Sequence, residues 1–249
     1  MKPEDEIELL LAKLHRLRLP GMAAAIRELL ARAARDNLTA LDVASQLCDE
    51  EIQSRVRSAI KRRVHDARFP EVSTIDGFDF DFDGSRKKIR ARYLALHDLG
   101  FLKHGINPLF IGVSGTGKTF LARALAYRAC QATRRVLFTS ATRMLNALQG
   151  AELHGQLERT LRPYGRADLL VIDDFAVLAM DPAQSRLAFQ VISERYEHHR
   201  STCITTNRPF KEWPKVFDDA LNAQIIAERL TERAEHFVLD GKSYRTRQP

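Results

Sequence analysis

The residues with the clearest chemical capacity lie in one short glycine-rich segment. It reads Gly112-Val113-Ser114-Gly115-Thr116-Gly117-Lys118-Thr119-Phe120. Up to the second threonine it matches the pattern G-x-x-x-x-G-K-[ST] at every position. The glycines allow a tight turn that aims several backbone N–H groups at one phosphate. Lys118 is long enough to reach the β- and γ-phosphates, and Thr119 offers a hydroxyl to Mg²⁺. The segment therefore predicts a site for ATP and Mg²⁺.

The residues around this segment support the same interpretation. Leu109-Phe-Ile111 is apolar and predicts a buried strand, and helical sequence begins at Lys118. A helix that begins at the loop adds its positive N-terminal end to the phosphate site. The alternative is a glycine turn with a stray lysine, which would not need a strand before it and a helix after it. We therefore expect a phosphate-binding loop.

A second group of candidate residues follows another apolar run. Leu169-Leu-Val-Ile172 predicts a strand that ends at Asp173 and Asp174. In a parallel sheet, this end of the strand lies beside the phosphate-binding loop. We therefore expect Asp173 to bind Mg²⁺ together with Thr119, and Asp174 to orient or deprotonate the attacking water. The alternative is a strand that simply ends in two solvated acids.

Two further polar residues are candidates for the reaction. A predicted strand over 202–206 ends beside Asn207, whose side chain can hydrogen-bond the water or the γ-phosphate. Thr206 competes for this role, and a plain turn at Asn-Arg-Pro is the alternative to both. Arg229 lies on a predicted helix, where an arginine is usually a surface residue. As an arginine finger it would instead enter the site of a neighbouring subunit, with Arg233 as the nearby competitor.

The pattern of apolar residues divides the chain into three parts. Helical spacing predicts a small all-α domain over 1–69. Residues 70–105 form a linker and a basic helix, and within them Phe78-Asp-Phe-Asp-Phe82 alternates like a short strand or an extended packing strap. Over 106–249 strands alternate with helices, which predicts an α/β fold with a parallel sheet flanked by helices. The predicted strands cover 109–111, 136–139, 169–172, 202–206 and 236–239.

Composition limits the partners and the compartment. The formal net charge of +7 favours an anionic partner, with nucleic acid first and acidic lipid second. Three widely spaced cysteines support neither a disulfide framework nor a zinc site. The acidic start is unlike a signal peptide, and no apolar run reaches the length of a membrane span, so we expect a cytoplasmic protein without a membrane partner. Basic clusters that are candidates for DNA contact are Arg55–Arg63, Arg86–Arg92 and Lys242–Arg247.

A family resemblance becomes visible when these motifs are taken together. The order and spacing of Gly112–Thr119, Asp173-Asp174, Asn207 and Arg229 resemble the AAA+ class. Asp-Asp-Phe in place of the more usual Asp-Glu looks like the helicase-loader branch, which includes DnaC and the IstB transposition helper proteins. Similarity to IstB extends over nearly the whole chain. It includes Leu17–Met22, Phe78–Phe80, Gly115–Ala122, Asp173–Phe175, Glu194–Tyr196, Arg200–Thr202, Glu212-Trp213, Glu228–Leu230 and Asp240–Ser243.

The resemblance implies an AAA+ ATPase that binds duplex DNA as a homo-oligomer and assists a cognate transposase in target capture and strand transfer. Arg229 matches the family's inter-subunit arginine, whereas Thr-Thr-Asn207 departs from the Ser-Gln of many relatives. Twenty residues follow Arg229, so we expect no C-terminal lid domain and a site that a neighbouring subunit completes. A DnaC-like replicative helicase loader and an ATP-binding DNA-architectural scaffold with little hydrolysis are the alternatives.

Overall fold

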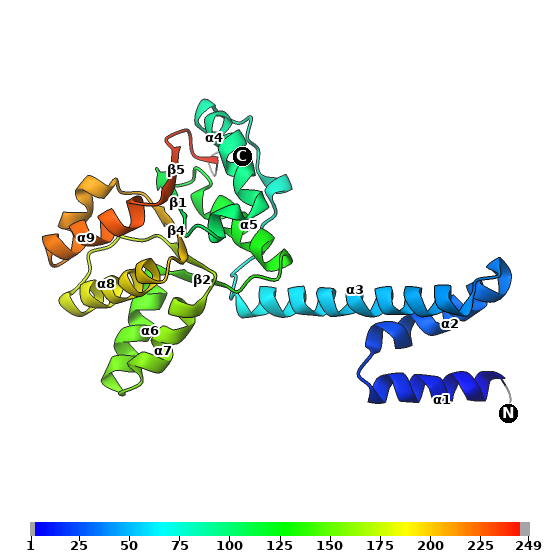
Figure 1. Cartoon of the computed structure of the whole chain (residues 1–249). Helices are drawn as coiled ribbons and strands as arrows, with labels where there is room; N and C mark the ends of the chain where they lie inside the picture. Colours follow the sequence, from blue (N-terminus) through cyan, green and yellow to red (C-terminus); the bar gives the residue numbers. More distant parts are fainter. Residues whose placement is uncertain (1–2, 245–249) are drawn as a thin grey trace. The chain divides into compact units, whose positions relative to one another are not determined.

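The computed structural model describes residues 3–244, which form two compact units divided between Arg62 and Arg63 (Figure 1). The first unit is helical, as the apolar spacing predicts. It contains α1 (Pro3–Arg16), α2 (Pro20–Asp36) and most of α3 (Ala40–Asp66). Its small apolar core is centred on Leu14 and Ile26.

One buried carboxylate joins two helices of this unit. Glu51 on α3 accepts hydrogen bonds from the backbone N–H groups of Gly21 (2.7 Å) and Met22 (3.3 Å). These groups belong to the first turn of α2, where backbone donors lack a partner within the helix. Arg55, one turn further along α3, donates a hydrogen bond of 2.8 Å to the other oxygen of Glu51. The carboxylate therefore caps α2 and fixes where α2 crosses α3.

The second unit is built on a five-stranded parallel sheet with the strand order β2-β3-β4-β1-β5. Every strand predicted from the sequence is present, and most extend one or two residues further. The strands are β1 (Asn107–Gly112), β2 (Val136–Ser140), β3 (Leu169–Asp173), β4 (Ser201–Thr206) and β5 (Ala234–Leu239). Because β1 lies between β4 and β5, its carboxyl end has two neighbouring strands from which polar groups can be supplied.

Helices cover both faces of the sheet (Figure 1). One face carries α4 (Gly84–Ala95) and α5 (Lys118–Gln131). The other carries α6 (Ala141–Leu153), α7 (Leu157–Arg166), α8 (Pro182–Glu197) and α9 (Ala220–Thr231). Short 3₁₀ turns occupy Ile75–Gly77, Leu96–Asp98, Gly100–Leu102 and Phe210–Lys215.

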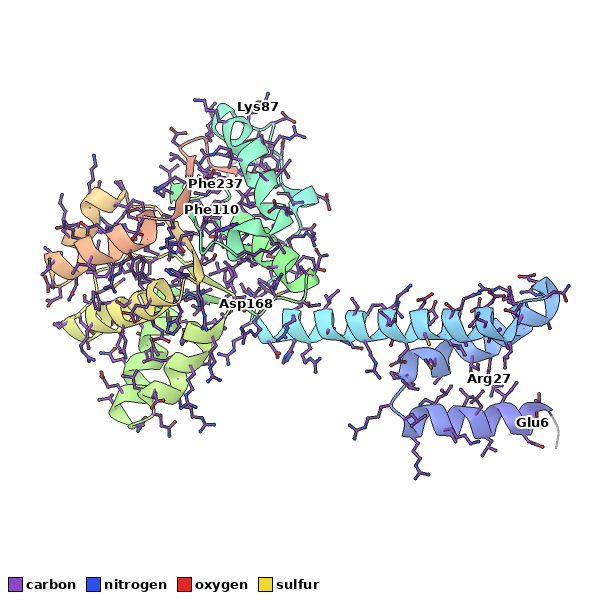
Figure 2. All side chains as sticks on the ribbon, viewed as in Figure 1. Glu6, Arg27, Lys87, Phe110, Asp168 and Phe237 are labelled. Atoms are coloured by element: carbon purple, nitrogen blue, oxygen red, sulfur yellow. The ribbon has the colours of Figure 1, made fainter. Side chains whose placement is uncertain are left out.

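The two apolar clusters follow the alternation of side chains along the strands. Phe110 on β1 faces α4 and α5, whereas its neighbour Leu109 faces the other helical layer. Phe110 stacks on Phe237 of β5 with a centroid separation of 5.0 Å (Figure 2). The sheet is therefore buried on both faces, as continuous apolar strands require.

The aromatic segment before α4 does not form a strand. It follows a 3₁₀ turn and is irregular at Phe78-Asp79 before a turn and a bend, so the alternative of a short strand is wrong. Phe78 and Phe80 are nevertheless buried in the cluster on the α5 face, which confirms the packing role. Among the helices within residues 3–244, none is long and apolar enough to cross a membrane.

Candidate nucleotide site

The glycine-rich segment forms the turn between β1 and α5 that its pattern predicts. Gly117 has φ of 101° and directly precedes α5, and a Cβ at this position would lie 2.6 Å from the Phe78 ring. A residue with a side chain is excluded there by both backbone conformation and space. The N-terminus of α5 therefore opens directly onto the loop, and this is the end of a helix that favours an anion.

The lysine of the loop is buried and folded over the loop itself. Lys118 Nζ donates to the carbonyl of Val113 over 2.8 Å. The hydroxyl of Thr116 donates to the same carbonyl over 2.9 Å. Two side chains of the loop thus hold its first turn in place, and the Lys118 ammonium already lies within the phosphate-binding turn.

Polar groups from three elements converge beside the loop. Thr119 Oγ1, at the start of α5, donates a hydrogen bond of 2.8 Å to Asp173 Oδ1 at the end of β3. Thr205 Oγ1, near the end of β4, donates to the same oxygen over 2.6 Å. The Thr205 oxygen also accepts from the backbone N–H of Asp174 over 2.9 Å. The predicted pair of Thr119 and Asp173 is therefore brought together, with Thr205 as an additional member.

These donor groups fit a magnesium ion. A carboxylate only accepts hydrogen bonds, so the hydroxyl proton of Thr119 points at Asp173 and the oxygen keeps lone pairs for a cation. Within residues 3–244 there is no cluster of three or more His, Cys, Asp or Glu side chains that would hold a metal unaided. Magnesium in phosphate-transfer sites needs few protein ligands, because phosphates and water supply the rest. One hydroxyl and one carboxylate are consistent with that requirement.

Asp174 lies at a sharp turn directly after β3. Its φ of 54° is left-handed, a conformation that is uncommon for residues other than glycine and that Asp adopts more readily than most. In this turn its N–H donates a hydrogen bond to Thr205 Oγ1. The Asp174 side chain lines a cavity of about 330 Å³ together with Lys118 and Thr119. The position agrees with a residue that acts on water near bound phosphate.

The same cavity extends from the loop to residues before α4. It is lined by Gly77, Phe78, Asp79, Arg86, Ser114, Gly115, Gly117, Lys118, Thr119, Phe120, Arg123, Asp174 and Tyr244. Phe78 and Phe120 lie with their ring centroids 5.7 Å apart. Phe78 therefore contributes both to the core and to the wall of the cavity, a second role that its alternating pattern did not indicate.

Thr205 is the residue that sequence reasoning missed. Thr205 and Thr206 are successive residues of β4, and Thr206 pairs with Ile111 on β1. Because side chains alternate along a strand, those of Thr205 and Thr206 leave opposite faces of the sheet. Thr206 Oγ1 accepts from the N–H of Arg208 over 3.2 Å, and Asn207 is exposed. None of Thr205, Thr206 and Asn207 lines the cavity itself, and what joins Thr205 to the site is its hydrogen bond to Asp173. The signal that could have found Thr205 is the register of β4, which a motif at the strand's end does not reveal.

Arg86 is the second residue whose position differs from expectation. It was grouped with basic residues that could contact DNA, but its side chain is only 3% exposed, so that assignment is wrong. Its guanidinium donates to the carbonyls of Asp79 (3.0 Å) and Thr116 (3.1 Å). Burial lowers the pKa of Arg86, and the nearby charge of Asp83 partly offsets this effect. The spacing along the helix could have indicated the burial of Arg86, because Arg86, Ile89 and Tyr93 share one helical face, which is buried.

Arg229 lies on α9, away from the cavity of its own chain. Its guanidinium lies over the rings of Phe189 (5.1 Å) and Tyr196 (5.3 Å) on α8, and it donates a hydrogen bond to Ser193. Arg233 contacts His199. Neither arginine lines the nucleotide cavity.

The fold and the loop together define an ATP-binding P-loop protein of the AAA+ type. Residues 12–249 match the family described as "IstB-like ATP binding protein", and the chain belongs to that family.

Curated relatives and solved structures agree with this assignment. The chain is 33% identical over 234 residues to "Insertion sequence IS5376 putative ATP-binding protein" of Geobacillus stearothermophilus, covering 94% of this chain and 92% of the relative. It is 31% identical to "Insertion sequence IS21 putative ATP-binding protein" of Pseudomonas aeruginosa, covering 98% and 89%. The DnaC helicase loader shares the fold with a TM-score of 0.60 at 20% identity, covering 68% of this chain and 97% of DnaC. AMPPCP-bound DnaA from Aquifex aeolicus has a TM-score of 0.55 at 21% identity, covering 68% and 51%.

Proposed function

We propose that the protein is a magnesium-dependent ATPase that binds duplex DNA as an oligomer and assists the transposase of an insertion sequence. The observation that carries the catalytic part is the convergence of Thr119, Asp173, Thr205 and Asp174 beside the phosphate-binding loop. A protein that only binds ATP needs the loop. The polar groups at the ends of β3 and β4 beside it are what hydrolysis requires in addition.

Each residue has a distinct task in this proposal. Lys118 and the loop amides bind the β- and γ-phosphates, and Thr119 and Asp173 hold Mg²⁺. When bound, Mg²⁺ neutralises charge that develops on the transferred phosphate. Asp174 orients the attacking water and takes up its proton. Thr205 keeps both aspartates in position through its two hydrogen bonds.

We propose that hydrolysis takes place at interfaces between subunits. Arg229 is remote from its own cavity, and α9 presents it beside the aromatic residues of α8. As an arginine finger it would stabilise the negative charge on the phosphates held by a neighbouring copy. This arrangement makes turnover depend on assembly. Asn207, directly after β4, is the candidate to bond the water or the γ-phosphate.

The part of the proposal that concerns transposition rests on relatives and on charge. The relatives at 31–33% identity are insertion-sequence proteins by name. The net charge of +7 suits a polyanionic partner such as duplex DNA. Exposed basic residues include Lys61 and Arg62 on α3 and Lys88 on α4. Residues 245–247 of the basic tail considered above lie outside the described residues.

One experiment tests the whole proposal. ATP turnover is measured for the full chain alone, with duplex DNA, with duplex DNA plus a cognate transposase, and with duplex DNA plus a replicative helicase, and Lys118→Ala serves as the inactive control. We expect DNA and transposase to raise turnover and the variant to stay at background. Turnover that responds to a replicative helicase and not to the transposase would identify a helicase loader instead. ATP binding without turnover under any condition would identify an architectural scaffold.

A further inference from the structure

The phosphate-binding loop is held from outside by a residue of α4. Arg86 donates one hydrogen bond to the carbonyl of Thr116, within the loop, and another to the carbonyl of Asp79, before α4. Its Nε has no hydrogen-bond partner within residues 3–244 and lies 3.9 Å from the nearest oxygen of Asp83. The two terminal nitrogens of this guanidinium therefore donate their hydrogen bonds to main-chain carbonyls and not to a carboxylate.

A second external contact holds the preceding peptide of the loop. The backbone N–H of Tyr244, beyond β5, donates to the carbonyl of Gly115 over 2.9 Å. Ser243 lies so close to the loop that a Cβ at Gly115, whose φ is 80°, would overlap its side chain. Residues 240–244, here called the C-terminal strap, thus run directly along the phosphate-binding loop.

The two contacts are joined by an aromatic cluster around one cation. The Arg86 guanidinium lies 4.6 Å from the ring centroid of Phe78, 4.7 Å from that of Phe82 and 4.8 Å from that of Tyr244. Cation–π attraction is strongest where water is excluded, and Arg86 is almost completely buried. Displacing Arg86 would therefore also release the strap from the loop.

These contacts determine where loop amides point. A trans peptide is planar, and its C=O and N–H are antiparallel. Fixing the carbonyl of Thr116 on Arg86 therefore aims the N–H of Gly117 away from Arg86. Fixing the carbonyl of Gly115 on Tyr244 aims the N–H of Thr116 away from the strap. Amides of such loops are the groups that bind phosphate oxygens, so their directions govern phosphate affinity.

We propose that Arg86 and the C-terminal strap are positioning elements for the triphosphate. They set two peptide planes of the loop before nucleotide arrives. The inference depends on the ATP-binding role of the family and not on hydrolysis, DNA or a transposase. It also connects the segment before α4 and the end of β5 to nucleotide occupancy, since both contact the loop through the same cluster.

The test compares two conservative variants of buried arginines. Arg86→Lys keeps a cation but loses the fork, and Arg195→Lys does the same at a guanidinium that donates to the carbonyls of Tyr164, Ala167 and Ser201, remote from the loop. Affinities for ATP are measured by calorimetry and those for AMP, which lacks the β- and γ-phosphates, by ligand-observed NMR. We expect Arg86→Lys to weaken ATP binding about tenfold or more, with AMP binding and the affinities of Arg195→Lys unchanged.

A second pair of variants tests the strap without altering Arg86. Tyr244→Pro removes the N–H that bonds Gly115, whereas Tyr244→Ala keeps it. We expect the proline variant to lose more ATP affinity than the alanine variant, again without a matching loss for AMP. Wild-type ATP affinity in Arg86→Lys, or equal losses for ATP and AMP, would overturn the role of Arg86. If Arg86→Lys does not fold, equal ATP affinities of the two Tyr244 variants would overturn the proposal.

Discussion

Thr205 Oγ1 lies 2.6 Å from Asp173 Oδ1, and this hydroxyl bridges the ends of β3 and β4 and also accepts a hydrogen bond from the N–H of Asp174. Because the N–H of Asp174 donates to the Thr205 oxygen, the Thr205 proton is directed at Asp173. The orientation of the hydroxyl is therefore set from both sides. One neutral side chain holds the predicted magnesium ligand and the predicted water-activating residue.

Thr205→Val is expected to disturb both aspartates with little change in volume. The valine leaves a backbone N–H without its partner, which costs about 1–3 kcal/mol of stability. A higher Mg²⁺ concentration should be needed for half-maximal ATP turnover, because Asp173 loses one of its positioning bonds. Titrating turnover with Mg²⁺, alongside thermal unfolding, checks both effects. Thr205→Ser retains the hydroxyl and should behave like the wild type, and equal behaviour of the two variants would contradict the bridging role.

Much of this site could be predicted, because the strand or helix beside each motif is also recognisable in the sequence. Gly112–Thr119 lies between an apolar strand and a helix, and Asp173 ends another strand, so a parallel sheet brings them to one edge. Thr205 could not be placed in this way. Its contact depends on the register of β4 against β3, where Ile172 pairs with Ile204, and on the turn at Asp174.

Local pattern alone does not decide which side chains are buried. Arg86 reads as one more cation of a basic helix, but long-range contacts with the loop and the aromatic segment bury it. Conversely, Ile52 and Val56 follow the apolar spacing of α3 and are 60% and 45% exposed. Helical spacing identifies which residues share a face. It does not identify what covers that face, because the covering element is distant in the sequence.

Lys118→Ala and Asp174→Asn are expected to fail at different steps. Removing the Lys118 ammonium should weaken ATP binding by roughly 10- to 100-fold, since a charge-assisted bond to phosphate is lost. Asp174→Asn should bind ATP normally and lower kcat by about 10²- to 10⁴-fold, the range for loss of a general base. Equilibrium binding of a fluorescent ATP analogue and single-turnover hydrolysis separate the two effects. Wild-type hydrolysis by Asp174→Asn would rule out the water-activating role.

Lys88 and Arg92 allow a matched test of DNA contact on α4. Both residues are exposed, but Arg92 already bonds Glu235 and the carbonyl of His236 (Lys87, beside Lys88 on α4, is labelled in Figure 2). If this face binds phosphate, Lys88→Ala should reduce the slope of log affinity against log salt by about 0.9. Arg92→Ala should change the slope less. An affinity for duplex DNA that is insensitive to salt would contradict phosphate binding at every basic cluster considered.

Glu51 should make the helical unit sensitive to acid. The hydrogen bond from Arg55 lowers the pKa of Glu51, burial opposes this effect, and the bonds from Gly21 and Met22 lower the pKa further. A depressed folded-state pKa means that ionised Glu51 stabilises the fold above its ordinary pKa of 4.5, and that this contribution is lost as pH falls through the lower folded value. Glu51→Gln should therefore loosen the start of α2 at pH 7, and the difference from wild type should disappear in acid.

Hydrogen exchange of the first turn of α2, read by mass spectrometry across this pH range, checks the prediction. Asp49→Asn is the matched control, because Asp49 lies on the same helix and is exposed. It should leave exchange at α2 unchanged at every pH. Equal protection of α2 in wild type and Glu51→Gln at pH 7 would show that the carboxylate charge does not hold the helix.

Mixing two inactive variants tests whether Arg229 acts between subunits. Lys118→Ala lacks a working nucleotide site but still carries Arg229, and Arg229→Ala binds ATP but lacks the arginine. In a mixed assembly the first variant can supply Arg229 to the nucleotide held by the second, so a fraction of interfaces becomes active. Neither variant alone should turn over ATP above background, whereas their mixture should recover turnover that depends on the ratio of the two. The loss of one phosphate-stabilising arginine is expected to cost about 10³-fold or more in kcat.

Arg233→Ala in place of Arg229→Ala distinguishes the two candidates, because only the residue that reaches the neighbouring nucleotide yields recovery on mixing. Persistent inactivity of both mixtures, with each variant shown to assemble, would mean that Arg229 on α9 and Arg233 just beyond it make contacts only within their own chain and do not complete a neighbour's site.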